Sequence, residues 1–122
     1  MKSRAVGSEP WIDVLARLAL FASASPPDLQ AIAGFACELE IDAGRVLVRE
    51  GQAADDMMVV LEGQAASTIN DCSSTELGPG AVVGEAAVLG GAVGTETVTA
   101  LTPMRLLVLP VRRLAEIPWQ RP

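Results

Sequence analysis

The chain has 122 residues, of which 50% are hydrophobic and 20% charged, and its formal net charge is -6. A chain of this length fits one domain with one core. No apolar run reaches the roughly 18 residues that a membrane-spanning helix needs, and the nine basic residues are scattered rather than gathered in a stripe that would bind nucleic acid. These features predict a single soluble domain with no membrane span and no direct nucleic acid binding.

Targeting and metal-binding signals are also missing from the sequence. Asp13 and Arg17 interrupt the apolar stretch before the small residues 22–24, so this stretch does not read as a secretory signal. Cys37 and Cys72 are too few and too far apart for a metal-binding knuckle. We therefore expect a cytoplasmic protein without a bound metal, whose cysteines act as small hydrophobic residues.

A first short helix is predicted near the N-terminus. Trp11, Val14, Leu15 and Leu18 recur at helical spacing, which predicts an amphipathic helix. We interpret residues 1–19 as a helical extension outside the core. Because its apolar stripe has only a small domain to pack on, we also expect the chain to self-associate.

A second helix is predicted from its start signal. Ser25 is suited to cap it, the next two residues are prolines that the first turn tolerates, and Asp28 lies near the positive end of the helix. Its buried face is predicted to comprise Leu29, Ile32, Ala33 and Ala36.

From Cys37 onward the hydrophobic period changes to two, which is typical of strands. Glycine-centred turns about every eight to twelve residues favour an all-β sandwich or barrel. We predict a mainly β domain over residues 20–117, an eight-stranded jelly-roll-like barrel (a double-stranded β-helix) with short flanking helices, followed by a tail at 118–122. The predicted strands are residues 37–41, 46–50, 57–61, 64–69, 74–77, 81–83, 96–101 and 105–109.

One segment interrupts the strand pattern. Residues 84–89 are rich in alanine and good helix formers, which predicts one helical turn at 85–89 inserted into the barrel. The first N–H groups of such a turn have no intrahelical partner, so they are suited to face an anion.

The glycine spacing resembles that of the cyclic nucleotide-binding domain found in catabolite-activator-type regulators, protein kinase regulatory subunits and gated channels. The resemblance spans residues 20–117 and implies a regulatory, signal-transducing module that binds cAMP or cGMP and is not an enzyme. Residues 77–85 are similar to the approach to the family's phosphate-binding cassette. The other matching positions are Ala43-Gly44, Glu50-Gly51, Asp55 and residues 58–63.

The resemblance implies specific roles in the cassette. Glu85, after Gly84, would accept a hydrogen bond from the ribose 2′-hydroxyl, and the backbone N–H groups of Ala86 and Ala87 would face the cyclic phosphate. A carboxylate is a strong acceptor for a hydroxyl, and helix-start amides are common donors to phosphate. The candidate ligand-binding residues are Gly84, Glu85, Ala86, Ala87, Gly94 and Thr95.

The sequence departs from the family where an arginine normally pairs with the phosphate. The usual Pro-Arg-small-small-Thr run here reads Val-Gly-Thr-Glu-Thr over residues 93–97, which puts Gly94 at the arginine position. Losing that forked contact costs about 1.5–3 kcal/mol, or one to two decades in affinity. We also expect Arg45, Arg49 and Arg105 to point outward into solvent. The phosphate would then face Glu85 and Glu96 without a cation, so cAMP and cGMP are predicted to bind weakly.

Two interpretations of the function remain open. The chain is either a sensor for a cyclic nucleotide or another small anion, or a degenerate barrel that serves protein interaction or oligomerisation, alone or within a longer protein. A cupin-type enzyme would need histidine ligands, and the chain has no histidine and no tyrosine, so we expect no catalytic residue and no cofactor.

The C-terminal segment is expected to be shorter than its counterpart in the family. After the last strand, residues 111–117 are predicted to form a helical stub where the family has a long helix, because Pro118 ends it. Trp119 is expected to anchor the tail on the barrel.

Overall fold

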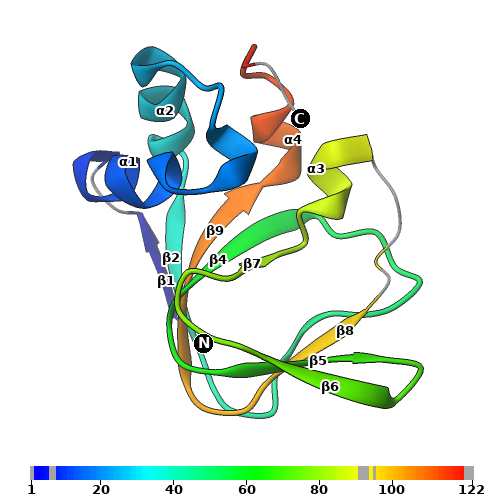
Figure 1. Cartoon of the computed structure of the whole chain (residues 1–122). Coiled ribbons are helices and arrows are strands. Elements are labelled where there is room, and N and C mark those ends of the chain that lie inside the picture. Colours follow the sequence, from blue (N-terminus) through cyan, green and yellow to red (C-terminus); the bar gives the residue numbers. More distant parts are fainter. Residues whose placement is uncertain (1, 6–7, 91–93, 95, 120–122) are drawn as a thin grey trace.

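The computed structural model describes residues 2–5, 8–90, 94 and 96–119. Two antiparallel sheets face each other and form a barrel (Figure 1). The first has the order β1-β2-β9-β4-β7, and its strands are β1 (Lys2–Ala5), β2 (Cys37–Ile41), β9 (Met104–Pro110), β4 (Asp56–Glu62) and β7 (Val82–Val83). The second has the order β3-β8-β5-β6, and its strands are β3 (Val46–Val48), β8 (Thr97–Ala100), β5 (Ala65–Ile69) and β6 (Cys72–Leu77).

All eight predicted strands are present, and the predicted jelly-roll-like architecture is confirmed. The largest differences at strand ends are of two residues: β6 begins at Cys72 instead of residue 74, and β3 stops at Val48 instead of residue 50. Its pairing with β8 shifts register between Val46 and Val48, and the N–H of Glu50 donates to the Thr97 side-chain hydroxyl, 3.1 Å away, rather than to a strand carbonyl. The β-bulge therefore ends the ladder before the period-two pattern ends.

The strand β1 was not predicted. It pairs antiparallel with β2, from Lys2 opposite Glu40 to Ala5 opposite Cys37. The sequence interpretation of residues 1–19 as a purely helical extension is therefore wrong at this strand. The segment has no alternating hydrophobic pattern, and it becomes a strand because the edge of β2 offers unpaired backbone groups.

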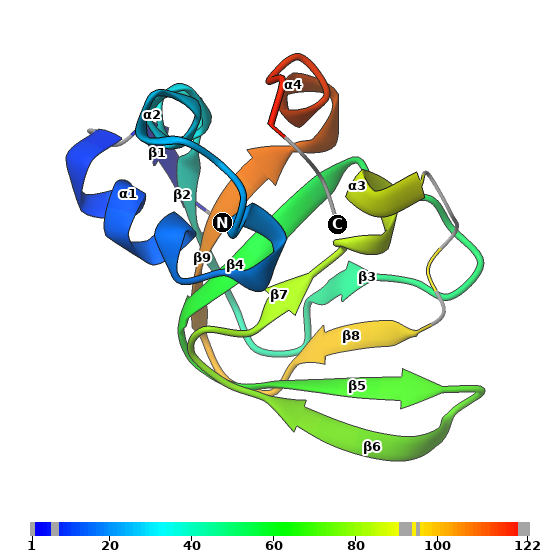
Figure 2. The same cartoon turned by 45° about the horizontal axis from the view of Figure 1, so that its top comes forward.

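Three helices, α1 (Ser8–Ala16), α2 (Pro26–Ala33) and α4 (Val111–Leu114), gather at one end of the molecule together with the 3-10 turn η1 (Ala19–Phe21) (Figure 2). Ser25 caps α2 as predicted, because the Asp28 N–H donates to its hydroxyl at 3.3 Å and its own N–H donates to the Asp28 carboxylate at 3.2 Å. Within the described residues, no helix combines the length and hydrophobicity needed to cross a bilayer.

The helix α1 belongs to the core, which corrects the expectation that it lies outside. Leu15 is fully buried, and Trp11, Val14 and Leu18 pack against the same hydrophobic cluster as α2 and α4. The apolar stripe of α1 is thus partly buried against its own chain, which weakens the reason to expect self-association through it.

Trp119 anchors the C-terminal segment, as predicted. Its side chain is buried, its ring meets that of Phe21 edge-on at 5.3 Å, and its indole N–H donates to the Leu20 carbonyl at 3.4 Å. It joins Leu15 and Leu114 in one cluster. The N-terminal helices and the residues after β9 therefore stabilise each other.

A single glycine places the inserted helix α3 (Ala86–Gly90), which was predicted at residues 85–89. Gly84 connects β7 to α3 with a φ of +82°, and a Cβ atom at this position would lie 2.6 Å from the Asp56 carbonyl oxygen. Both the left-handed backbone and the close approach to β4 exclude a side chain.

Two alanine substitutions test this constraint. Gly84→Ala is expected to lower the free energy of unfolding by roughly 3 kcal/mol, because it adds a backbone clash to the φ strain. Gly80→Ala is the matched control, since Gly80 has a φ of +92° with nothing within 4 Å of its Cβ position, and it should cost about 1 kcal/mol. Urea denaturation measures both, and equal losses would contradict the proposed contact.

Candidate functional site

A pocket of about 230 Å³ lies beside α3. It brings together four of the residues predicted from the sequence, Gly84, Glu85, Ala86 and Gly94. Ala87 lies in α3, but its side chain is outside what the structure describes, and Thr95 lies outside the described residues. The other lining residues are Val48, Gln52, Ala54, Val82, Leu89 and Glu96.

The helix α3 joins the pocket to the core. Its first turn is closed on the Glu85 carbonyl, which accepts hydrogen bonds from the N–H groups of Val88 at 3.0 Å and Leu89 at 3.2 Å. Val88 packs against the cluster that contains Leu114 and Trp119, whereas Leu89 and the exposed Glu85 line the pocket. A ligand in the pocket would therefore contact one side of a helix whose other side packs on the core.

Gly94 is tied to the loop after β3 by two backbone hydrogen bonds. Its carbonyl accepts from the Gly51 N–H at 2.9 Å, and its own N–H donates to the Gln52 carbonyl at 3.0 Å. A Cβ atom at position 94 would lie 3.3 Å from the Arg49 carbonyl oxygen, and the φ of Gly94 is not in the left-handed region. A side chain at this position therefore requires the Arg49 carbonyl to move by a few tenths of an ångström.

Glu96 brings a carboxylate to the pocket, and a buried hydroxyl holds it. The hydroxyl of Ser67 donates to one Glu96 carboxylate oxygen. Ser67 shares the inward face of β5 with Ala65, which lies in the barrel core. The sequence pointed to Glu96 as a nearby charge but gave no role to Ser67, although the alternation of β5 places Ser67 inside.

Arg105 is engaged elsewhere in the barrel. Its guanidinium lies 2.9 Å from the Glu38 carboxylate and 3.4 Å from that of Glu62. Glu38 is buried on β2, beside β9. The expectation that Arg105 points outward into solvent is therefore wrong, because the buried Glu38 carboxylate holds it on the sheet. Arg105 does not line the pocket, so it does not replace the missing arginine.

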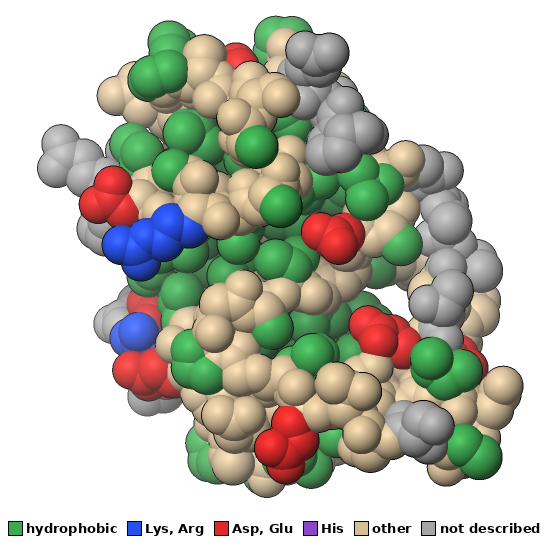
Figure 3. Space-filling view, viewed as in Figure 1, with side chains coloured by type: hydrophobic (Ala, Val, Ile, Leu, Met, Phe, Trp, Pro, Cys, Tyr) green, Lys and Arg blue, Asp and Glu red, His purple; other side chains and the backbone are tan. Residues whose placement is uncertain are grey.

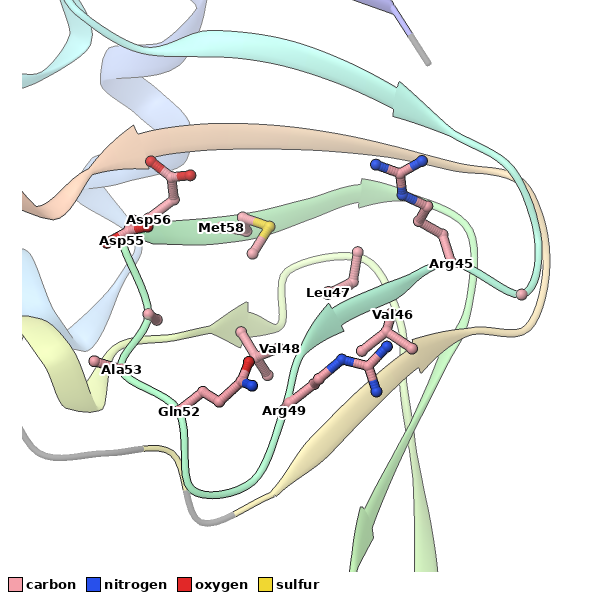
Figure 4. Close-up of a pocket in the computed structure, with 12 residues that line it drawn as sticks. Arg45, Val46, Leu47, Val48, Arg49, Gln52, Ala53, Asp55, Asp56 and Met58 are labelled. Carbon is pink, nitrogen blue, oxygen red and sulfur yellow. The ribbon is translucent and has the colours of Figure 1, made fainter.

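Arg45 and Arg49 belong to a neighbouring groove of about 510 Å³ between β3 and the start of β4 (Figure 4). Figure 4 shows the Arg49 side chain extending from β3 away from Gln52, which lies on the wall shared with the pocket. Both arginines are exposed. Their outward placement agrees with the expectation from the sequence.

The far end of this groove is acidic. Burial of Asp56, and then the negative charge of Asp55, raise the pKa of the Asp56 carboxyl above its usual value. Asp56 also supplies the carbonyl that approaches Gly84, so the first residue of β4 lines the groove and contacts a residue of the pocket wall.

The electrostatic character of the pocket follows from these positions. Among the described residues that line it, the charged ones are Glu85 and Glu96, and neither lysine nor arginine is present. On the face shown in Figure 3, the charged side chains beside α3 are acidic, whereas the basic ones lie near the opposite edge of the view. No group of histidine, cysteine or acidic side chains in the described part of the chain is arranged to hold a metal ion. The pocket therefore presents negative charge.

The chain is similar to known proteins in both sequence and structure. A cyclic nucleotide-gated potassium channel of Mesorhizobium japonicum is 34% identical over 96 residues, which are 79% of this chain and 26% of the channel. The regulatory domain of Toxoplasma gondii PKA, crystallised with cAMP, superimposes with a TM-score of 0.80 at 28% identity, covering 90% of this chain and 44% of that one.

A cyclic nucleotide-binding-like protein from Brucella abortus is similar over nearly its whole length. Its TM-score is 0.76 at 28% identity, and the match covers 87% of this chain and 95% of that one. By contrast, this chain spans about a quarter of the length of the potassium channel. The family model for the cyclic nucleotide-binding domain matches residues 38–118. The chain belongs to the cyclic nucleotide-binding domain family.

Proposed function

We propose that this domain is a regulatory module whose pocket binds cAMP or cGMP only weakly, because Gly94 leaves the cyclic phosphate without a cation. The observation that carries the proposal is the charge of the pocket, where the charged residues among the described lining are Glu85 and Glu96. A cyclic phosphate keeps its negative charge at neutral pH. The N–H groups at the start of α3 offset only part of that charge.

The remaining contacts of a cyclic nucleotide are available. Glu85 lies at the pocket and is exposed, which suits a carboxylate that accepts a hydrogen bond from a ribose hydroxyl. Val82, Ala86 and Leu89 supply apolar surface for the remainder of the ligand. The pocket therefore offers an acceptor for a ribose hydroxyl and apolar surface, but its described lining offers no cation to the phosphate.

A regulatory role without catalysis agrees with the relatives, which are described as a gated channel and a kinase regulatory domain. The alternative, a barrel that serves only as a docking surface, has less support because the apolar stripe of α1 is partly buried against its own core. We infer that the domain acts on an effector, and that occupation of the pocket shifts α3 against the cluster around Trp119.

Restoring an arginine tests the missing phosphate contact. Gly94→Arg is expected to tighten cAMP binding at least tenfold, because a forked donor adds roughly 1–3 kcal/mol at a position whose φ tolerates a side chain. Isothermal titration of both chains measures the change. Gln30→Arg, on the exposed face of α2, adds the same charge away from the pocket and should leave the affinity unchanged. Micromolar cAMP binding by the unmodified chain would mean that another cation serves the phosphate.

A second pair of titrations tests Glu85. In the Gly94→Arg chain, cAMP should bind roughly tenfold more tightly than 2′-deoxy-cAMP, because the carboxylate accepts a hydrogen bond from the 2′-hydroxyl. Adding Glu85→Ala should remove this preference. If the preference survives the substitution, Glu85 is not the ribose acceptor.

A further inference from the structure

We infer that Glu96, held in place by Ser67, is a second specificity determinant that excludes anionic ligands from the pocket. This inference rests on the proposed function, since it concerns the same pocket. It differs in naming a residue that acts by repulsion, whereas Gly94 acts by lacking a cation. Charge selectivity is then set at two positions on the segment that precedes β8.

The Glu96 carboxylate is held in position by Ser67. Ser67 is 6% exposed and lies on the inner face of β5. The Ser67 hydroxyl donates to Glu96. On β8, Ser67 lies opposite Val98, which follows Glu96 by two residues. A buried hydroxyl on the inner face therefore holds the Glu96 carboxylate toward the barrel interior instead of leaving it free in solvent.

The negative charge of Glu96 has no cation beside it in the described lining of the pocket. The hydrogen bond from Ser67 leaves the charge of Glu96 in place, because a hydroxyl is a neutral donor. Arg45 and Arg49 line the neighbouring groove, and Arg105 is paired with Glu38. Among the described residues that line the pocket, no cation is available to neutralise this carboxylate.

An arginine introduced at position 94 would start close to Glu96. A Cβ atom there would lie 3.8 Å from the Glu96 carbonyl oxygen, so the new side chain would begin beside Glu96. Its guanidinium could then pair with that carboxylate, and the pair would compete with the ligand phosphate. Gly94→Arg alone therefore recovers only part of the available affinity.

The test uses the Gly94→Arg chain with and without E96Q. Glutamine keeps the shape of Glu96 and the acceptor for Ser67 while removing the charge. Isothermal titration with cAMP, an anion, and with adenosine, which is uncharged, separates charge from fit. Thermal unfolding checks that each chain is folded. The control is Glu76→Gln, which removes an exposed carboxylate on β6 outside the pocket.

The double variant is expected to bind cAMP about tenfold more tightly than the Gly94→Arg chain, because one repelling and competing carboxylate is gone. Adenosine binding should change less than about twofold. Glu76→Gln should change neither. If E96Q prevents folding, Glu96→Ala replaces it, with the same expected gain for cAMP.

The outcomes separate this inference from the proposed function. If both arginine chains bind cAMP equally well, the role of Glu96 is overturned while the proposed function stands. If E96Q tightens cAMP and adenosine by the same factor, Glu96 shapes the pocket and does not select by charge, which also overturns the inference. If neither arginine chain binds cAMP, the proposed function fails together with the inference.

Discussion

The contact between Gly84 and the Asp56 carbonyl fixes the position of the helix on which the pocket depends. At this point β7 approaches β4 so closely that a Cβ atom would lie 2.6 Å from the carbonyl oxygen, and the chain turns into α3 through a φ of +82°. The turn leaves Glu85 and Ala86 on the pocket and Val88 on the core. The helix that lines the pocket therefore also packs on the cluster that holds Trp119 and Leu15 of α1.

The second physical feature is the negative charge of the pocket. The backbone around Gly94 is held by Gly51 and Gln52, and its φ is not in the left-handed region that favours glycine. Glu96 is drawn inward by Ser67. The barrel thus keeps the fold of its family, while the described lining of the pocket carries two carboxylates and no cation.

Much of this was predictable because local patterns carry it. The period-two alternation and the spaced glycines gave the strands, the alanine-rich run gave α3, and the Pro-Pro-Asp sequence after Ser25 gave the capped start of α2. The resemblance to the family also pointed to Gly84, Glu85, Ala86 and Gly94, which the structure brings to one pocket.

Features that depend on partners distant in sequence were not predictable in this way. The strand β1 forms only because β2 has a free edge, and its four residues show no alternation. The stripe of α1 resembles an exposed surface until Trp119 and Leu114 are seen to share its cluster. Ser67 and Glu96 are 29 residues apart, so nothing in either segment shows that they meet.

The central claim is that the pocket of the unmodified chain repels a phosphate, and the dependence of cAMP binding on salt tests it most directly. Salt screens charge interactions over about 10 Å at 0.1 M, and over less at higher concentration. The account predicts that the weak cAMP affinity, followed by NMR at millimolar ligand, stays constant or rises as salt increases from about 0.05 to 0.5 M. An affinity that falls steeply with salt would show an attractive cation at the phosphate and would contradict the account.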